Sequence, residues 1–152
     1  MPGSEESFDL KNFTKAIERY EYIDSDTLRQ HLIYFLEQII PVAEKAGIQM
    51  AIHPDDPPYS VLGLPRIMST ENDAAAMLEA VPSPANGLCF CTGSFGARPD
   101  NNIPKMLKRF GDHVHFLHLR NTKRDSEGNF YEADHLAGDT NMYEVVKEVL
   151  QI

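Results

Sequence analysis

The sequence contains three short strand-like segments that each end in a possible metal ligand: Ile48-Gln49-Met50-Ala51-Ile52-His53, Gly87-Leu88-Cys89-Phe90-Cys91 and His113-Val114-His115-Phe116-Leu117-His118. Loop-forming residues follow each segment. Enzymes of the α/β class build their active sites at the carboxyl ends of parallel strands. The repeated placement of a ligand at this position therefore predicts a metal-dependent enzyme.

Helical patterns lie between and around these segments. A helix is predicted to begin after Ser25 or Asp26, with Pro41 kinking or splitting it and Gly47 ending it. Its apolar stripe has the spacing of an amphipathic helix and consists of Leu28, Leu32, Phe35, Leu36, Ile39 and Ile40.

Four shorter helices complete the pattern. They are predicted over about 9–22, from Ser69 or Thr70 to Ala80, over about 102–110, and over about 141–150 with Asp139 or Thr140 as the cap. The polar segment 122–133 predicts a turn or hairpin at Glu127-Gly128. Alternating helices and strands predict an α/β fold with right-handed crossovers. Three parallel strands would leave two sheet edges to be covered.

The composition is that of an ordinary globular domain, and we expect residues 1–152 to form one domain. Hydrophobic residues make up 42% and charged residues 24% of the chain. The net charge of -9 argues against nucleic-acid or anionic-membrane partners. Met1 to Glu6 lacks the apolar stretch of a signal peptide. The chain has two cysteines, Cys89 and Cys91, and residues so close together form a poor disulfide. We therefore expect the reducing cytoplasm.

The candidate ligands are His53, Cys91 and His118. Two imidazoles and a thiolate suit Zn, Fe(II), Mn or Co(II) better than Mg or Ca. Each of these residues alone would more often be an ordinary structural residue, so the prediction rests on their joint placement. His113 and His115 are not expected to be ligands, since His115 faces away from His118 by strand alternation.

Several polar residues close to these ligands have two possible roles. Arg120, followed by Asn121, could hold a substrate carboxylate, or Arg120 could form a surface ion pair. Asp55 and Asp56 could orient His53 through hydrogen bonds to their carboxylates, or both could be solvated loop acids. For Asp56 we favour the solvated loop acid.

Asp134-His135 could be an acid/base or ligand pair, and a structural role is the favoured interpretation.

Seven stretches resemble the D-mannonate dehydratase family: Ile40-Pro41-Val42-Ala43-Glu44, Ala51-Ile52-His53-Pro54-Asp55-Asp56-Pro57-Pro58, Gly63-Leu64-Pro65-Arg66-Ile67, Pro82-Ser83-Pro84-Ala85-Asn86-Gly87, Phe90-Cys91-Thr92-Gly93-Ser94, Ala97-Arg98-Pro99-Asp100-Asn101 and His115-Phe116-Leu117-His118-Leu119-Arg120-Asn121. The resemblance implies a (β/α)8 TIM barrel, of which this chain would hold about three parallel βα units. It implies Mn(II) or Fe(II) as the cofactor. It also implies a sugar-acid substrate, D-mannonate, dehydrated to 2-dehydro-3-deoxy-D-gluconate in glucuronate catabolism. The implied metal ligands are again His53, Cys91 and His118.

The resemblance also implies that the chain is a fragment. In the family, an Arg-Pro-Asp-His-Gly motif and a later Tyr supply the fourth metal ligand and the acid/base residues, which would lie beyond Ile152. We therefore expect no catalytic acid/base residue here, weak metal binding, and little or no activity without a complementing barrel chain. The alternatives are a non-catalytic remnant that self-associates through open sheet edges into a homo-oligomer, and a different metalloenzyme that uses Asp134 or His135.

Overall fold

A computed structural model describes residues 9–152. Residues 1–6, where no signal peptide is expected, lie outside the described residues. The elements are α1 (Leu10–Glu18), α2 (Ser25–Lys45), β1 (Met50–Ile52), α3 (Glu71–Ala80), β2 (Asn86–Cys91), α4 (Thr92–Gly96), α5 (Ile103–Phe110), a 3-10 turn η1 (Gly111–His113), β3 (Val114–His118), β4 (Asn121–Arg124), β5 (Phe130–Ala133) and α6 (Met142–Val149).

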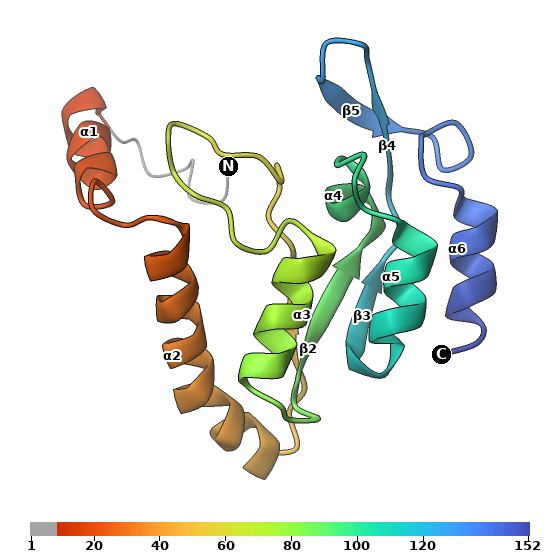
Figure 1. The fold of residues 1–152 in the computed structure, drawn as a ribbon, viewed down its shortest axis with the longest axis horizontal. Helices are drawn as coiled ribbons and strands as arrows, with labels where there is room; N and C mark the ends of the chain where they lie inside the picture. The colour runs from red at the N-terminus through yellow and green to blue at the C-terminus, as the bar shows by residue number, and fades with distance from the viewer. Residues whose placement is uncertain (1–8) are drawn as a thin grey trace.

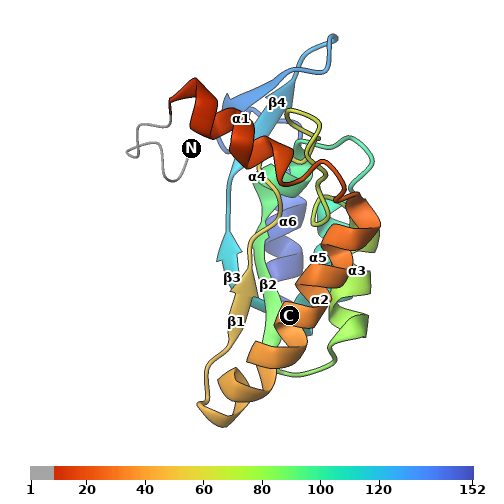
Figure 2. The same ribbon diagram turned by 90° about the vertical axis from the view of Figure 1, so that its left-hand side faces the viewer.

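The central sheet has the order β1-β2-β3, with both pairs of neighbours parallel. Figure 1 shows β2 and β3 of this sheet side by side. Figure 2 shows that α2, α3, α5 and α6 cover one face of this sheet, whereas the other face carries no helix along its length. The predicted α/β fold of about three parallel βα units is confirmed. Within residues 9–152 the strands do not close into a barrel.

The core lies between the covered face of the sheet and the helices. Leu88 and Phe90 of β2 are fully buried, and Leu36 and Ile40 of α2 are 1% exposed. Their neighbours in the core come mainly from α3, α5 and α6 and include Ala74, Met77, Met106, Leu107, Phe110 and Val145. Alternation along β2 puts Cys91 on the face opposite to Phe90. Burial of one face of β2 therefore determines which side of the sheet receives the ligand.

The helix caps differ from the prediction at two positions. Asp24 caps α2, so this helix begins at Ser25. Asn141, whose side chain accepts a hydrogen bond from the Glu144 N–H, caps α6 in place of the expected Asp139 or Thr140. Thr70 caps α3, one of the two residues predicted for this role, and Asp9 caps α1. Helix α1 is shorter than predicted, because residues 19–22 form turns.

Pro41 does not split α2, which is continuous from Ser25 to Lys45. Proline lacks the N–H that would bond the carbonyl of Glu37, and Glu37 is exposed to water. Burial of Ile40 and Ala43, on either side of Pro41, stabilises the helix across the proline.

Two short elements adjoin the ligand-bearing strand ends. The hairpin of β4 and β5 confirms the predicted turn at Glu127-Gly128, and Gly128 has a φ of 88° that favours glycine. The segment after Cys91, expected as a loop, forms the buried helix α4. Among the described residues no helix has the length and apolar character needed to cross a membrane.

Candidate metal centre

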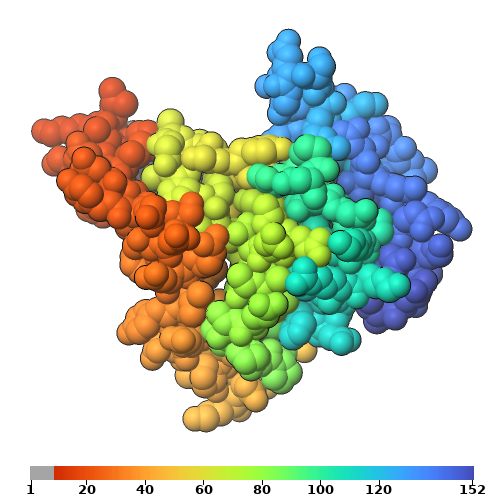
Figure 3. Space-filling view, in the orientation of Figure 1, coloured from red at the N-terminus to blue at the C-terminus, as the bar shows by residue number. Residues whose placement is uncertain are grey.

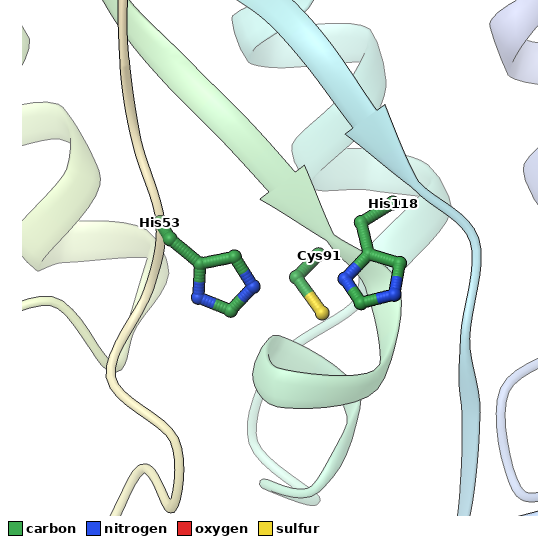
Figure 4. A group of neighbouring side chains, drawn as sticks. All are labelled: His53, Cys91 and His118. Atoms are coloured by element: carbon green, nitrogen blue, oxygen red, sulfur yellow. The ribbon is translucent and has the colours of Figure 1, made fainter. Parts of the chain in front are cut away.

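The three predicted ligands meet at the carboxyl ends of the parallel strands. Figure 4 shows the side chains of His53, Cys91 and His118 turned toward one another. One possible ligand atom from each residue lies within 4.8 Å of those of the other two. Cys91 is completely buried, while both histidines are exposed. The group is thus anchored by a buried sulfur and is open to solvent at the imidazoles.

The imidazole of His53 is oriented by the backbone of the next residue. Its Nδ1 lies 2.7 Å from the carbonyl oxygen of Pro54. Because a carbonyl only accepts hydrogen bonds, Nδ1 carries the proton in this contact and Nε2 is left with a free lone pair. Metal-binding histidines usually donate their second N–H in this way. The tautomer of His53 therefore fits a metal ligand.

The sulfur of Cys91 sits where β2 ends and α4 begins. It accepts hydrogen bonds from the backbone N–H of Ser94 at 3.4 Å and from the Ser94 hydroxyl at 3.2 Å. These two contacts fix the sulfur at the strand end, where it is turned toward the two imidazoles. Cys89 is not one of the three converging residues. Burial, and then the neighbouring Cys91, raise the pKa of the Cys89 thiol above its ordinary value.

The donor set fits a divalent transition metal. One thiolate and two imidazoles are the ligand types found with Zn, Fe(II), Mn or Co(II). Three protein ligands leave at least one coordination position free, as catalytic sites require and closed structural sites do not.

Arg120 lies directly beyond His118 and forms an ion pair. Its Nη1 is 2.5 Å from the Asp56 carboxylate, and its Nε is 3.3 Å from the Glu132 carboxylate. Burial lowers the pKa of Arg120, but the hydrogen bond and charge of Asp56 outweigh this, and the net pKa is raised. The guanidinium is thus held in its charged form beside the three ligands.

Asn121, expected to bind substrate, has its amide fully used within the chain. Its Nδ2 donates to the carbonyls of His135 at 2.7 Å and Thr140 at 2.9 Å. Its Oδ1 accepts from the N–H groups of Thr122 at 3.0 Å and Thr140 at 3.1 Å. The residue is 1% exposed. This geometry contradicts direct contact with a substrate and gives Asn121 a positioning role instead.

Replacing Asn121 with alanine should destabilise the chain by about 2–3 kcal/mol, because buried backbone groups lose their partners. Urea unfolding of the wild type and of Asn121→Ala measures the difference. Asn129→Ala, at the exposed hairpin tip, is a suitable control, and we expect a much smaller effect. Equal effects for the two variants would contradict the positioning role.

The hydrogen bond of the His53 ring goes to Pro54, not to either of the two aspartates after β1. Asp55 accepts hydrogen bonds from the N–H groups of Ile67 and Met68 at 2.8 and 2.7 Å, so it holds a loop. Asp56 is an exposed loop acid, as favoured, but its carboxylate also pairs with Arg120.

The other histidines lie outside the ligand group. Nδ1 of His113 contacts the Asn86 carbonyl at 3.3 Å, and Nδ1 of His115 contacts the Met50 carbonyl at 2.6 Å. His135 Nε2 is 3.1 Å from the Leu119 carbonyl. Neither Asp134 nor His135 belongs to the group of three, which agrees with the structural role favoured for this pair.

Comparison with known proteins identifies the family. The model of the D-mannonate dehydratase (UxuA) family matches residues 1–152. The chain belongs to this family. The D-mannonate dehydratases are hydro-lyases, enzymes that eliminate water from their substrates.

Individual relatives agree with this assignment. The chain is 51% identical over 151 residues to a mannonate dehydratase of Marinomonas sp. (strain MWYL1), covering 99% of this chain and 39% of the relative. It is 50% identical over 150 residues to that of Saccharophagus degradans, covering 99% and 38%. The chain thus spans about two fifths of the length of these relatives.

A solved structure from the D-mannonate dehydratase family has the same fold. The crystal structure of mannonate dehydratase from Streptococcus suis serotype 2 superposes with a TM-score of 0.83 at 38% identity. The match covers 89% of this chain and 40% of the other.

Sequence reasoning missed one residue that organises this D-mannonate dehydratase segment. The Thr92 hydroxyl is buried, lies 2.6 Å from the carbonyl of Arg120, and is 2.9 Å from its N–H. It therefore joins the segment that follows Cys91 to the one that follows His118. The only signal was the β-branched, polar residue directly after a ligand at a strand end.

Proposed function

We propose that residues 1–152 form a partial TIM-barrel domain that carries the metal-binding part of a D-mannonate dehydratase. The proposed reaction converts D-mannonate to 2-dehydro-3-deoxy-D-gluconate and water in glucuronate catabolism. The observation that carries the proposal is the convergence of the His53, Cys91 and His118 ligand atoms within 4.8 Å of one another. Mn(II) or Fe(II) is the proposed ion.

Each of the site residues has a proposed task. His53, Cys91 and His118 would hold the ion, which when bound supplies Lewis-acid stabilisation of negative charge developing on the sugar acid. Arg120 would hold the carboxylate of the substrate through its Nη2 group, since Asp56 pairs with Nη1 and Glu132 with Nε. Asn121 would act indirectly, by fixing the backbone beside Arg120.

The reaction also needs a base and an acid. The base removes the proton from C2, and the acid protonates the C3 hydroxyl so that it leaves as water. The described residues near the three ligands offer no such pair, because Asp56 is bound to Arg120 and the second histidine nitrogen of His53 is bound to Pro54. We therefore propose that full activity requires barrel strands from a complementing chain.

A complementation assay tests this function. The chain is mixed with Mn(II) and with the parts of the Marinomonas enzyme that lie outside its match to this chain. We expect formation of 2-dehydro-3-deoxy-D-gluconate from D-mannonate with the complement, little without it, and none when Cys91→Ser replaces the wild type. Strong turnover by the chain alone would refute the need for complementation. Turnover by complemented Cys91→Ser would refute the metal site.

A second candidate function is a non-catalytic remnant that self-associates. The sheet has β1 and β3 at its edges, and Phe116 is 60% exposed on the face without helices. Open edges and an exposed aromatic favour association of copies. Light scattering distinguishes the two candidates: stable homo-oligomers that do not dissociate on addition of the complementing strands would favour the remnant.

The proposed compartment is the cytoplasm. Cys89 and Cys91 are both free thiols in the structure, as reducing conditions require.

A further inference from the structure

The three ligands are not held equally by the sheet. Cys91 and His118 are partners in the ladder between β2 and β3. The ladder between β1 and β2 ends at Ile52, paired with Leu88, so His53 lies beyond its last pair. The sheet therefore fixes the separation of Cys91 and His118, but it does not fix the distance of His53 from either of them.

An ion pair links the His53 segment to the His118 segment. Asp56 follows His53 by three residues, and Arg120 follows His118 by two. Their contact of 2.5 Å joins the two outer ligand segments across the end of β2, where β1 and β3 are not neighbours.

Both ends of this ion pair are themselves anchored. On the Asp56 side, the Asp55 carboxylate is fixed by the Ile67 and Met68 N–H groups, and the Asp55 N–H donates to the Met68 carbonyl at 3.0 Å. On the Arg120 side, the Thr92 hydroxyl holds the backbone. The side chain of Arg120 also packs against Gly93, where an added Cβ would lie 2.6 Å from its Cγ.

We infer that Asp56 and Arg120 form a brace that sets the position of His53 and thereby the affinity of the metal centre, an inference that rests on the proposed function. Asp56 is a positioning residue that acts through the histidine three residues before it. Without the brace, metal binding must also order the 53–56 segment, and this cost appears as weaker binding.

The test measures Co(II) affinity by chelator competition, using the thiolate-to-cobalt absorption of Cys91 as the signal. Asp56→Ala should lower the affinity about 10-fold. Arg120→Met, which keeps the aliphatic stem against Gly93, should lower it to a similar extent. A purely electrostatic role predicts the opposite sign for Arg120→Met, because removing a positive charge favours a cation.

A second comparison asks whether the brace acts through His53. In a His53→Ala background, the further change Asp56→Ala should leave the Co(II) affinity unchanged within about 2-fold, since the ligand that it positions is gone. A general structural role would weaken both backgrounds equally. The milder Asp56→Asn, which keeps an acceptor oxygen, should give an intermediate loss and serves if Asp56→Ala does not fold.

Asp100→Ala is the matched control. Asp100 pairs with Arg98 at 2.6 Å, but this ion pair lies within one segment and joins no two ligands. We expect wild-type affinity. If the wild type binds Co(II) and the brace variants bind it equally well, the inference is wrong while the metal centre stands. If the wild type itself binds no Co(II), the proposed function fails together with the inference.

Discussion

Replacing Cys91 with serine should lower the affinity for Mn(II), Fe(II) or Co(II) by more than about 100-fold. Loss of a residue that only hydrogen-bonds to a metal ligand costs up to about 100-fold, and loss of the ligand itself should cost more. Cys91 supplies the only sulfur among the three converging ligands, and it is the only one of them that is buried. Its replacement leaves two exposed imidazoles, one of which lies beyond the last pair of its ladder. Two such groups cannot hold a metal ion tightly. Metal titration with an absorbance or fluorescence readout measures the loss.

The neighbouring cysteine provides the control for this experiment. Cys89 lies on the same strand and the same face, two residues earlier, and it is not one of the converging ligands. Cys89→Ser should bind metal like the wild type. Equal losses in the two variants would mean that the strand, and not the Cys91 sulfur, controls binding, and would contradict the assigned ligand set.

Replacing Phe90 with alanine should destabilise the chain by about 3–5 kcal/mol. Phe90 is fully buried, and its ring packs at 5.2 Å from that of Phe95, measured between ring centroids. Truncation removes this apolar surface and leaves a cavity in the core beside the end of β2. A loss of this size is a large part of the about 5–15 kcal/mol that stabilises a typical domain. Since Cys91 is the next residue, metal binding should weaken in the same variant.

Phe116 is a control of the same residue type on the next strand. It is 60% exposed, so Phe116→Ala should change the free energy of unfolding by no more than about 0.5 kcal/mol. Urea denaturation of the wild type and both variants gives the comparison. A Phe90→Ala variant within 1 kcal/mol of the wild type, or a Phe116→Ala variant as unstable as Phe90→Ala, would contradict the described core.

The ligand set could be predicted from sequence because its signal is local. Each ligand follows an apolar strand, and parallel strands bring their carboxyl ends to one edge. His53, Cys91 and His118 therefore needed no knowledge of long-range packing. The hairpin after Asn121 was predictable for the same reason, from the turn residues at Glu127-Gly128.

Residues whose roles depend on partners far along the chain could not be predicted. The contact of Asp56 with Arg120 depends on how two strand ends that are not neighbours lie across β2. Asn121 is a polar residue three positions after His118. The amino-acid sequence does not show whether its amide faces a substrate or the chain's own backbone. Both roles became clear only from the three-dimensional contacts.

Two other predictions, the cap of α6 and the effect of Pro41 on α2, were wrong because several local preferences act at the same place. Asp139, Thr140 and Asn141 are all good helix caps, and the choice of Asn141 depends on where the preceding loop ends. Proline destabilises a helix interior, but the burial of Ile40 and Ala43 outweighs this cost at Pro41.

We expect one divalent ion to be bound by His53, Cys91 and His118. X-ray absorption spectroscopy of the Mn(II)- or Fe(II)-loaded chain can identify these ligands, because sulfur and imidazole scatter differently from oxygen. The coordination shell should contain one sulfur and two imidazoles, and the sulfur should be lost in Cys91→Ser. A shell made only of oxygen ligands, or a sulfur that persists in Cys91→Ser, would refute this ligand set.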